Sequence, residues 1–344
     1  MLVCGEFTST QGVIRGDGKM NRIDKPKLTS NQLVSKLKND KGVTFRYEDE
    51  QSAEKFLHDR NNYMRTASYR KNYIKYTKGL NKGKYINLDF GYLKELSILD
   101  MYLRDIIVRM CIDIEHDLKV KLVNDVESDA TENGYDIVDQ FLNKYSYIRD
   151  NKLAATVSSP YTYGLASKYF DINKVKNKKT GKIENVIQMV DCPVWVIVEL
   201  LTFGDFMRLY DFYYSVKGNA PVTYKVLNLV RNLRNGCAHN NCILADLTPH
   251  SSVPPVEVAT AVSQISTIKN NQRKKKMSNR VVMEFISMLY VYNLVVSGKV
   301  KFHRIQELKK FWNGRMVEKK AFFKTNELLV GTYDFVKKVV EAWF

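Results

Sequence analysis

Apolar residues recur every three or four positions through the stretch from Leu93 to Val123. They are Leu93, Leu96, Leu99, Leu103, Ile106, Ile107, Met110, Ile114, Leu118 and Leu122. This spacing follows the 3.6-residue period of an α-helix, so it predicts one long helix with a continuous apolar face. We expect this helix to be the central element of the core.

Shorter helical patterns occupy much of the remaining chain. They begin at Ser30, Asp49 and Pro193, and they continue over Val222–Leu233, Ser278–Val296, Lys301–Trp312 and Thr325–Phe344. We expect the helix after Pro193 to be interrupted at Phe203-Gly204-Asp205, and the lysine-rich stretch Lys174–Lys182 to be an exposed loop or hairpin. The sequence therefore predicts an all-α fold: a helical bundle with additional N-terminal and C-terminal helices.

Pattern and composition divide the chain into four parts. Residues 1–24 carry little pattern, and residues 25–92 form a helical region rich in basic and aromatic residues. Residues 93–250 form the helical core, and residues 256–344 form a C-terminal helical region that follows the proline-containing loop Pro249–Pro255. The 44% hydrophobic content supports a sizeable buried core.

A polar segment, Arg231–Asn241, follows one of the predicted helices, and no Asp or Glu occurs between Phe212 and Ala245. Within it, Arg234 supplies a permanent cation with a planar set of donors, and His239 titrates near neutral pH. Such an arginine fits phosphate oxygens and can stabilise the charge that develops on a reacting phosphate, while a histidine can transfer a proton. The segment is therefore a candidate phosphate site.

Cleavage of RNA is the reaction that suits this set, because the ribose 2′-hydroxyl is an internal nucleophile that DNA lacks. The reaction needs an acid, a base and a cation, so we expect no metal and no cofactor. We assign proton transfer to His239, the scissile phosphate to Arg234 and positioning to Asn235. The candidate auxiliary groups are Glu115, His116 and Asn240. Two plainer readings stay open: this spacing occurs by chance in many chains, and a lone helical histidine is commonly structural.

The net charge of +17 indicates a polyanionic partner, either nucleic acid or an anionic membrane. The longest apolar runs, near Val194–Phe203 and Leu289–Val296, are shorter than the ~20 residues that span a bilayer. The first residues also lack the apolar segment of a signal peptide. We therefore expect a cytoplasmic protein that binds nucleic acid and not membrane.

Five cysteines occur at positions without paired spacing: Cys4, Cys111, Cys192, Cys237 and Cys242. A disulfide framework is not expected from this pattern. Cys237, His239 and Cys242 supply only three of the four ligands that a structural zinc site needs. We expect buried thiols and no metal site.

Basic and aromatic residues alternate between Arg60 and Leu88, a stretch without any acidic residue. The candidate RNA-binding residues are Arg60, Arg65, Tyr69, Arg70, Lys71, Tyr73, Lys75, Lys78, Lys82 and Lys84, with Arg231 added from the polar segment. Cations can neutralise phosphates, and exposed tyrosine rings can stack on unpaired bases. A solvated helix followed by a Lys-Gly loop, with the tyrosines packed inward, would give the same pattern.

From Lys25 to about Leu244 the sequence resembles the Abi family of bacterial phage-defence proteins, of the AbiD and AbiF type. The stretches that carry the resemblance are Lys25-Pro26, Asn61-Asn62-Tyr63, Tyr69–Tyr73, Asp100–Arg104, Ile114-Glu115, Leu201–Phe206 and Leu233–Asn241. The resemblance implies a role in abortive infection and, for some members, binding of a cognate small noncoding RNA. RNA is therefore the partner that it favours.

This family resembles the HEPN superfamily of helical-bundle ribonucleases, whose motif is Arg, a polar residue, a short spacer and His. Arg234, Asn235 and His239 fill those positions. Arg234 and His239 are separated by about 140° around a straight helix, so one helix face cannot hold both. Either the helix starts or bends near Gly236, or two copies of the motif meet in a homodimer, as the resemblance implies.

Overall fold

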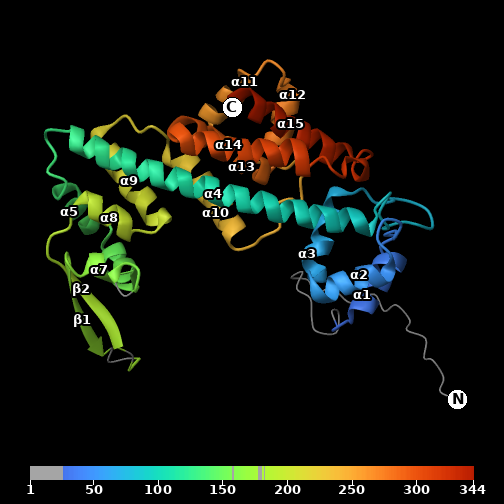
Figure 1. Ribbon diagram of the computed structural model, residues 1–344, viewed down its shortest axis with the longest axis horizontal. Helices are drawn as coiled ribbons and strands as arrows, with labels where there is room; N and C mark the ends of the chain where they lie inside the picture. The colour runs from blue at the N-terminus through green and yellow to red at the C-terminus, as the bar shows by residue number, and fades with distance from the viewer. Residues whose placement is uncertain (1–25, 157–158, 177–179, 182) are drawn as a thin grey trace. The chain divides into compact units, whose positions relative to one another are not determined.

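The computed structural model describes residues 26–156, 159–176, 180–181 and 183–344 (Figure 1). The predicted segment 1–24 and Cys4 lie outside the described residues. The chain divides into two compact units. The first unit contains the described residues up to Ala67 together with Tyr73–Leu93, and the second contains Ser68–Asn72 and Lys94–Phe344. The second unit thus includes both the predicted helical core and the predicted C-terminal region.

The first unit is built on two short helices, α1 (Ser30–Asn39) and α2 (Glu50–Asp59), followed by α3 (Tyr63–Ser68). Thr29, one residue before the predicted cap Ser30, is the N-cap of α1 and forms a capping box with Gln32. Asp49 caps α2 as its sequence predicts. The carboxylate of Asp89 is buried and joins the two ends of the unit, because it accepts hydrogen bonds from Thr44 Oγ1 at 2.7 Å and Arg46 N at 2.8 Å.

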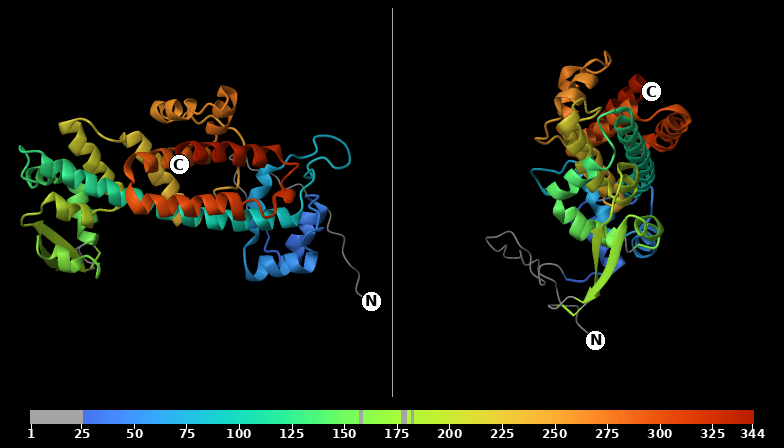
Figure 2. Two further views of the ribbon diagram at one scale, coloured as in Figure 1. Left: turned by 45° about the horizontal axis from the view of Figure 1, so that its top comes forward. Right: turned by 90° about the vertical axis from the view of Figure 1, so that its left-hand side faces the viewer.

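The predicted long helix is α4 (Phe90–Ser128), and it is the central element of the second unit. All ten residues predicted to line its apolar face are buried, from Leu93 to Leu122. Arg304 Nε on α14 (Gly298–Lys310) pairs with Asp113 on α4 at 2.9 Å, so α14 runs beside α4 (Figure 2). Tyr292 on α13 (Arg280–Val295) also donates to Asp113, at 3.0 Å.

Further helices complete the second unit (Figure 1). In chain order they are the 3-10 turn η1 (Tyr69–Asn72), α5 (Asp136–Lys144), the π-helical turn η2 (Ile148–Leu153), α6 (Ala154–Thr156), α7 (Tyr163–Ala166), α8 (Val194–Leu200), α9 (Phe203–Lys217), α10 (Tyr224–Ala238), α11 (Val256–Ser263), α12 (Asn270–Met277), the turns η3 (Phe311–Arg315) and η4 (Lys320–Phe322), and α15 (Glu327–Trp343). The helix α10 packs along α13 and against α9. The predicted all-α class is confirmed.

One small sheet interrupts the helical fold of the described residues. The strands β1 (Phe170–Lys176) and β2 (Ile183–Met189) pair antiparallel, from Phe170 opposite Met189 to Lys176 opposite Ile183. A loop or a hairpin is predicted for the lysine-rich stretch 174–182, and its described residues 174–176 pair with β2 as in a hairpin, while 177–179 and 182 lie outside the described residues.

The predicted interruption after Pro193 lies earlier than expected. Helix α8 ends before Leu201, and Thr202 is the N-cap of α9. The Thr202 side chain accepts from the Asp205 backbone at 3.3 Å and donates to the Asp205 carboxylate at 2.7 Å. Phe203-Gly204-Asp205 is therefore the first turn of α9 and not a break, because a threonine cap and an acidic third residue start a helix well.

Candidate functional site

Helix α10 carries the first part of the Arg-Asn-His motif. Its buried face consists of Val226, Leu227, Val230, Leu233 and Cys237, which recur at helical spacing. Arg231, Arg234 and Asn235 are half-buried beside this face, and His239 is exposed directly after the last helical residue. The motif therefore spans a helix end, with its two leading residues in the final turn.

The helix ends in a Schellman turn that sets the position of His239. His239 is the C-cap, and Asn240 adopts a left-handed conformation with φ of 60°. Asn240 N donates to Cys237 O and Asn241 N donates to Gly236 O, both at 2.9 Å, which is the hydrogen-bond pattern of this motif. The expectation that the helix starts or bends near Gly236 is wrong, because regular helix continues through Gly236 to Ala238.

Within one chain the two motif residues do not pair. Arg234 Nη1 donates to the neighbouring Asn235 Oδ1 at 3.1 Å, and no hydrogen bond joins Arg234 to His239 among the described residues. The positive charge of Arg234 also acts to lower the pKa of the Cys111 thiol on α4, against the larger effect of burial. Asn235 therefore orients the arginine, and the histidine is left open to solvent.

A buried carboxylate on α4 holds the loop that follows the histidine. Asp100 is fully buried, and its Oδ1 accepts a hydrogen bond from Leu244 N at 3.0 Å. Its Oδ2 accepts from Tyr69 Oη at 2.7 Å and from the guanidinium of Arg104. Arg104 also donates to Asn241 O at 3.3 Å. The ion pair of Asp100 and Arg104 thus fixes both ends of the segment 241–244 on α4.

Three asparagines extend this anchoring. The side-chain amide of Asn72 makes two hydrogen bonds to the backbone of the loop: it donates to Leu244 O and accepts from Leu247 N, both at 2.8 Å. Asn279 donates to Asp246 O at 3.0 Å and to Thr248 O at 2.8 Å. Asn326 donates to Asn72 O at 3.0 Å. We call residues 241–248 the anchored loop, since side chains of Asn72, Asp100, Arg104 and Asn279 bond to its backbone.

Sequence patterns did not identify these supporting residues as part of the site. The carboxylate of Asp100 was a usable signal, because its position in α4 lies among the apolar residues Leu96, Leu103 and Ile107. A charge there must be paired in the fold. The asparagines gave no comparable signal.

Cys111 and Cys237 are buried in the core as expected, whereas Cys242 is only half-buried. Burial raises the pKa of the Cys111 thiol well above its usual value, with neighbouring Cys237 adding to the effect and Arg234 opposing it. Burial also raises the pKa of Cys237 to about 12. Thiols with such pKa values are poor nucleophiles and poor metal ligands at neutral pH. Among the described residues, no group of three His, Cys, Asp or Glu side chains has the arrangement of a metal site.

The auxiliary candidates lie at different places. Glu115 is half-buried and pairs with Lys119 at 3.4 Å on the same helix, and His116 is exposed. Asn240 forms the left-handed turn directly after the end of α10. Arg231 donates to Asn228 at 2.5 Å and lies over Gly204 of α9, where a side chain's first carbon would come within 3.5 Å of the guanidinium. Arg231 thus packs on the Phe-Gly-Asp-Phe turn beside the motif.

The basic and aromatic stretch is divided between the units. In the first unit Arg60, Lys75, Lys78 and Lys82 are exposed, while Arg65, Tyr73 and Lys84 are half-buried. A backbone bridge joins Lys75 to Tyr85, and the Lys75 ammonium lies 4.9 Å from the centre of the Tyr85 ring. This part of the stretch forms a hairpin-like loop that presents lysines to solvent.

The remaining part, Tyr69–Lys71, belongs to the second unit. Tyr69 is buried and donates to Asp100, so its ring offers no face to a base. Burial and the Asp100 charge raise the pKa of Tyr69, which keeps its hydroxyl a donor. Lys71 is exposed and Arg70 is half-buried. We therefore leave Tyr69 out of the RNA surface proposed below.

None of the described helices is long and apolar enough to cross a membrane.

Comparison with known proteins gave one match. The family model described as Abi-like protein matches residues 55–245, which is more than half of the chain and includes α4, α10 and the motif. Neither the curated proteins nor the solved structures gave a match.

Proposed function

Since the chain belongs to the Abi-like protein family, which is associated with abortive infection, we propose that it defends against phage as a metal-independent endoribonuclease of the HEPN type. The observation that carries the proposal is the presentation of His239. This histidine is exposed at the end of a helix whose last turn carries Arg234 and Asn235, and the loop behind it is fixed by a buried ion pair. A rigid support of this kind is what proton transfer at a defined phosphate requires.

The residues then act in sequence on one phosphate. His239 removes the proton from the 2′-hydroxyl or returns one to the leaving 5′-oxygen, and Arg234 stabilises the negative charge that develops on the phosphate. Asn235, which accepts a hydrogen bond from Arg234, holds the guanidinium in position. The bond to the 5′-oxygen breaks as the 2′-oxygen bonds to phosphorus, which leaves a 2′,3′-cyclic phosphate.

The site is completed by a second copy of the chain. A single copy exposes one His239 and bonds Arg234 to Asn235, so a second copy would supply a second histidine and thus separate proton donor and acceptor groups. Next to Cys111 on α4, Ile112 is 53% exposed, and Met101 on the same helix is 50% exposed. In the proposed dimer a second copy would cover exposed apolar side chains such as these.

Removal of the histidine ring tests the nuclease. The His239→Ala variant should lose cleavage of RNA in the presence of EDTA and keep the parent's RNA affinity and stability, because the side chain is exposed. His303 is an exposed histidine on α14, so His303→Ala is the matched control and should cleave like the parent. Cleavage by His239→Ala at the parent's rate would refute the proposal.

The hydrogen bond from Arg234 to Asn235 within one chain favours a second function. In this alternative the protein binds a structured small noncoding RNA as a stable ribonucleoprotein and does not cut it. The lysines of the first unit supply affinity that falls steeply with salt, by a slope of roughly 0.7–0.9 in log units per phosphate contact. Sequencing of RNA copurified from the cytoplasm separates the two: one intact species indicates the ribonucleoprotein, and heterogeneous cut ends indicate the nuclease.

A further inference from the structure

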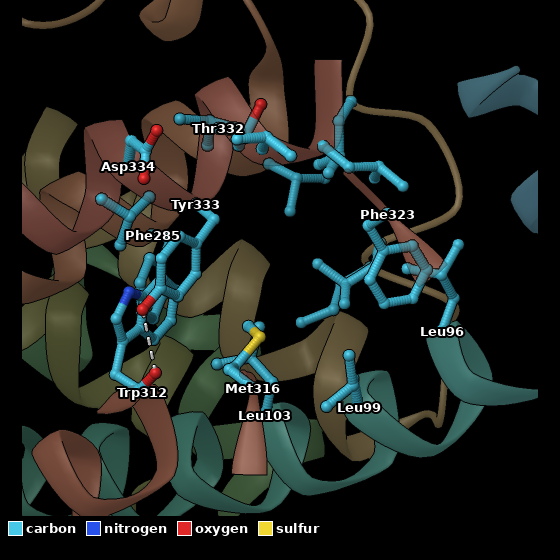
Figure 3. Close-up of a pocket in the computed structure, with 18 of the residues that line it drawn as sticks. Leu96, Leu99, Leu103, Phe285, Trp312, Met316, Phe323, Thr332, Tyr333 and Asp334 are labelled. Carbon is cyan, nitrogen blue, oxygen red and sulfur yellow. Dashed lines mark hydrogen bonds between the residues drawn. The ribbon is translucent and has the colours of Figure 1, made fainter. Parts of the chain in front are cut away.

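The second unit contains an apolar cavity of about 300 Å³ (Figure 3). Leu96, Leu99 and Leu103 of α4 form one wall, and residues of α13 and α15 form the opposite wall. Figure 3 shows the rings of Trp312, Tyr333 and Phe285 at one end and the ring of Phe323 at the other. Trp312 stacks on Tyr333 with ring centres 5.6 Å apart, which makes that end flat and rigid.

The chemistry of the lining selects an apolar occupant. Most of the residues that line the cavity are aliphatic or aromatic, and the charged or hydroxyl-bearing ones are Lys320, Thr332, Tyr333 and Asp334. Water needs two to four hydrogen-bond partners to reside in a protein interior, so an apolar space of this kind disfavours it. The volume is about twice the roughly 150 Å³ of an engineered apolar cavity that binds benzene, so there is room for a medium-length alkyl chain.

The cavity shares a wall with the anchored loop. Ile243, Leu244 and Leu247 line it with their side chains. The backbone of Leu244 bonds to Asp100 and Asn72, and that of Leu247 bonds to Asn72. An occupant would therefore contact the same residues whose hydrogen bonds fix the segment behind His239.

We propose that the cavity binds an uncharged molecule with a single alkyl chain and that occupancy stabilises the anchored loop. Binding fills space that otherwise leaves Leu244 and Leu247 without packing partners on one side, so these residues are held more firmly when the site is full. The binding step is independent of the nuclease. Its effect on RNA cleavage rests on the proposed function. Because coupling between two binding sites is reciprocal, an RNA that binds better to the ordered loop would also tighten binding of the alkyl compound.

The first test measures binding of 1-decanol to the full chain by calorimetry. The parent should bind one equivalent saturably and gain thermal stability, because a ligand that binds only the folded state stabilises it. Val330 lines the cavity and is 37% exposed, so Val330→Trp should block the space and reduce affinity by about tenfold or more. Val256 on α11 is 77% exposed and outside the cavity, which makes Val256→Trp the matched control with unchanged affinity.

A second blocking variant, Val317→Phe, guards against a local folding defect in Val330→Trp, since Val317 also lines the cavity from another segment. Both blocked variants should keep the parent's circular dichroism and lose decanol binding. Absence of saturable binding by the parent would overturn the proposal, as would parental affinity in both blocked variants.

Hydrogen exchange tests the coupling without any RNA. Saturating decanol should slow exchange of the Leu244 and Leu247 amides by about fivefold or more, while amides of α5 in the same unit stay unchanged. Unchanged exchange at these two amides would overturn the coupling. If binding and protection are found in a protein that cuts no RNA, the cavity assignment stands and the proposed nuclease function fails.

Discussion

The carboxylate of Asp100 accepts a hydrogen bond from the backbone N–H of Leu244, 144 positions later in the chain, at 3.0 Å. This contact joins the central helix to the loop behind the motif histidine. The same carboxylate also receives the Arg104 guanidinium and the Tyr69 hydroxyl, so three groups depend on one buried charge. Its removal should therefore affect the support of the candidate site more than any surface change.

Replacement of Asp100 by an uncharged residue should lower the stability of the folded protein. In Asp100→Asn the amide keeps the shape of the side chain but leaves Arg104 buried without an anion, which should lower the free energy of unfolding by about 3 kcal/mol. Urea denaturation measures the effect. Asp105→Asn is the matched control, because Asp105 pairs with Arg109 in the same i,i+4 arrangement on the exposed side of α4 and should change stability by less than about 1 kcal/mol. Equal losses in both variants would contradict the proposed anchoring.

The left-handed conformation of Asn240 leads to a separate prediction. Asn240 has φ of 60°, a conformation that glycine adopts freely and that costs most other residues roughly 1–2 kcal/mol. Asn240→Gly should preserve or slightly raise thermal stability, and Asn240→Val should lower it by that amount. The reverse order of stability, measured by calorimetry, would show that the turn does not depend on this conformation.

A buried lysine predicts a dependence of stability on pH. Lys276 donates to Thr332 Oγ1 at 2.8 Å and to Leu328 O at 3.2 Å, and burial lowers its pKa to about 8. The folded state therefore releases this proton before the unfolded state does. The free energy of unfolding should rise as pH increases from about 8 towards the usual lysine value near 10.4, and the contribution should be flat below that window.

Replacement of this lysine checks the sign. Lys276→Met should raise stability at pH 7 by on the order of 2 kcal/mol and remove the rise above pH 8, since it eliminates a charge that is costly to bury. Thr332 still donates to Leu328 O at 2.7 Å, so no polar group is left without a partner. Lys274→Met, at an exposed position of α12, is the control and should leave the pH profile unchanged. If the free energy of unfolding of Lys276→Met still rises above pH 8, the rise comes from another titratable group.

Dimer formation through α4 gives the fourth prediction. Ile112→Arg replaces an exposed apolar residue of α4 by a charge and should shift the protein from dimer to monomer in analytical ultracentrifugation, with loss of cleavage. Leu294 on α13 is 52% exposed, so Leu294→Arg is the matched control and should remain dimeric. A parent protein that is monomeric at micromolar concentration would favour the ribonucleoprotein function instead.

The long helix and the all-α class followed from the sequence because apolar periodicity over many turns is a strong local signal. The end of α10 was harder to predict. Gly236 drew attention as a weak helical position, yet Asn240 supplies the left-handed turn that glycine more often provides. The inward role of Tyr69 depends on Asp100, a partner 31 positions away, so no local pattern could separate it from exposed tyrosines. Local signals located the motif, and distant contacts determine what supports it.

The anchored loop also has a consequence for the order in which the protein is made. Its hydrogen-bond partners lie at Asn72 and Asp100, which precede it, and at Asn279, which follows it; Asn326 in turn holds Asn72. During synthesis the motif leaves the ribosome well before Asn279 and Asn326 do. Contacts between such distant residues form late in folding. The loop behind His239 therefore gains its full support only after Asn326 has been synthesised.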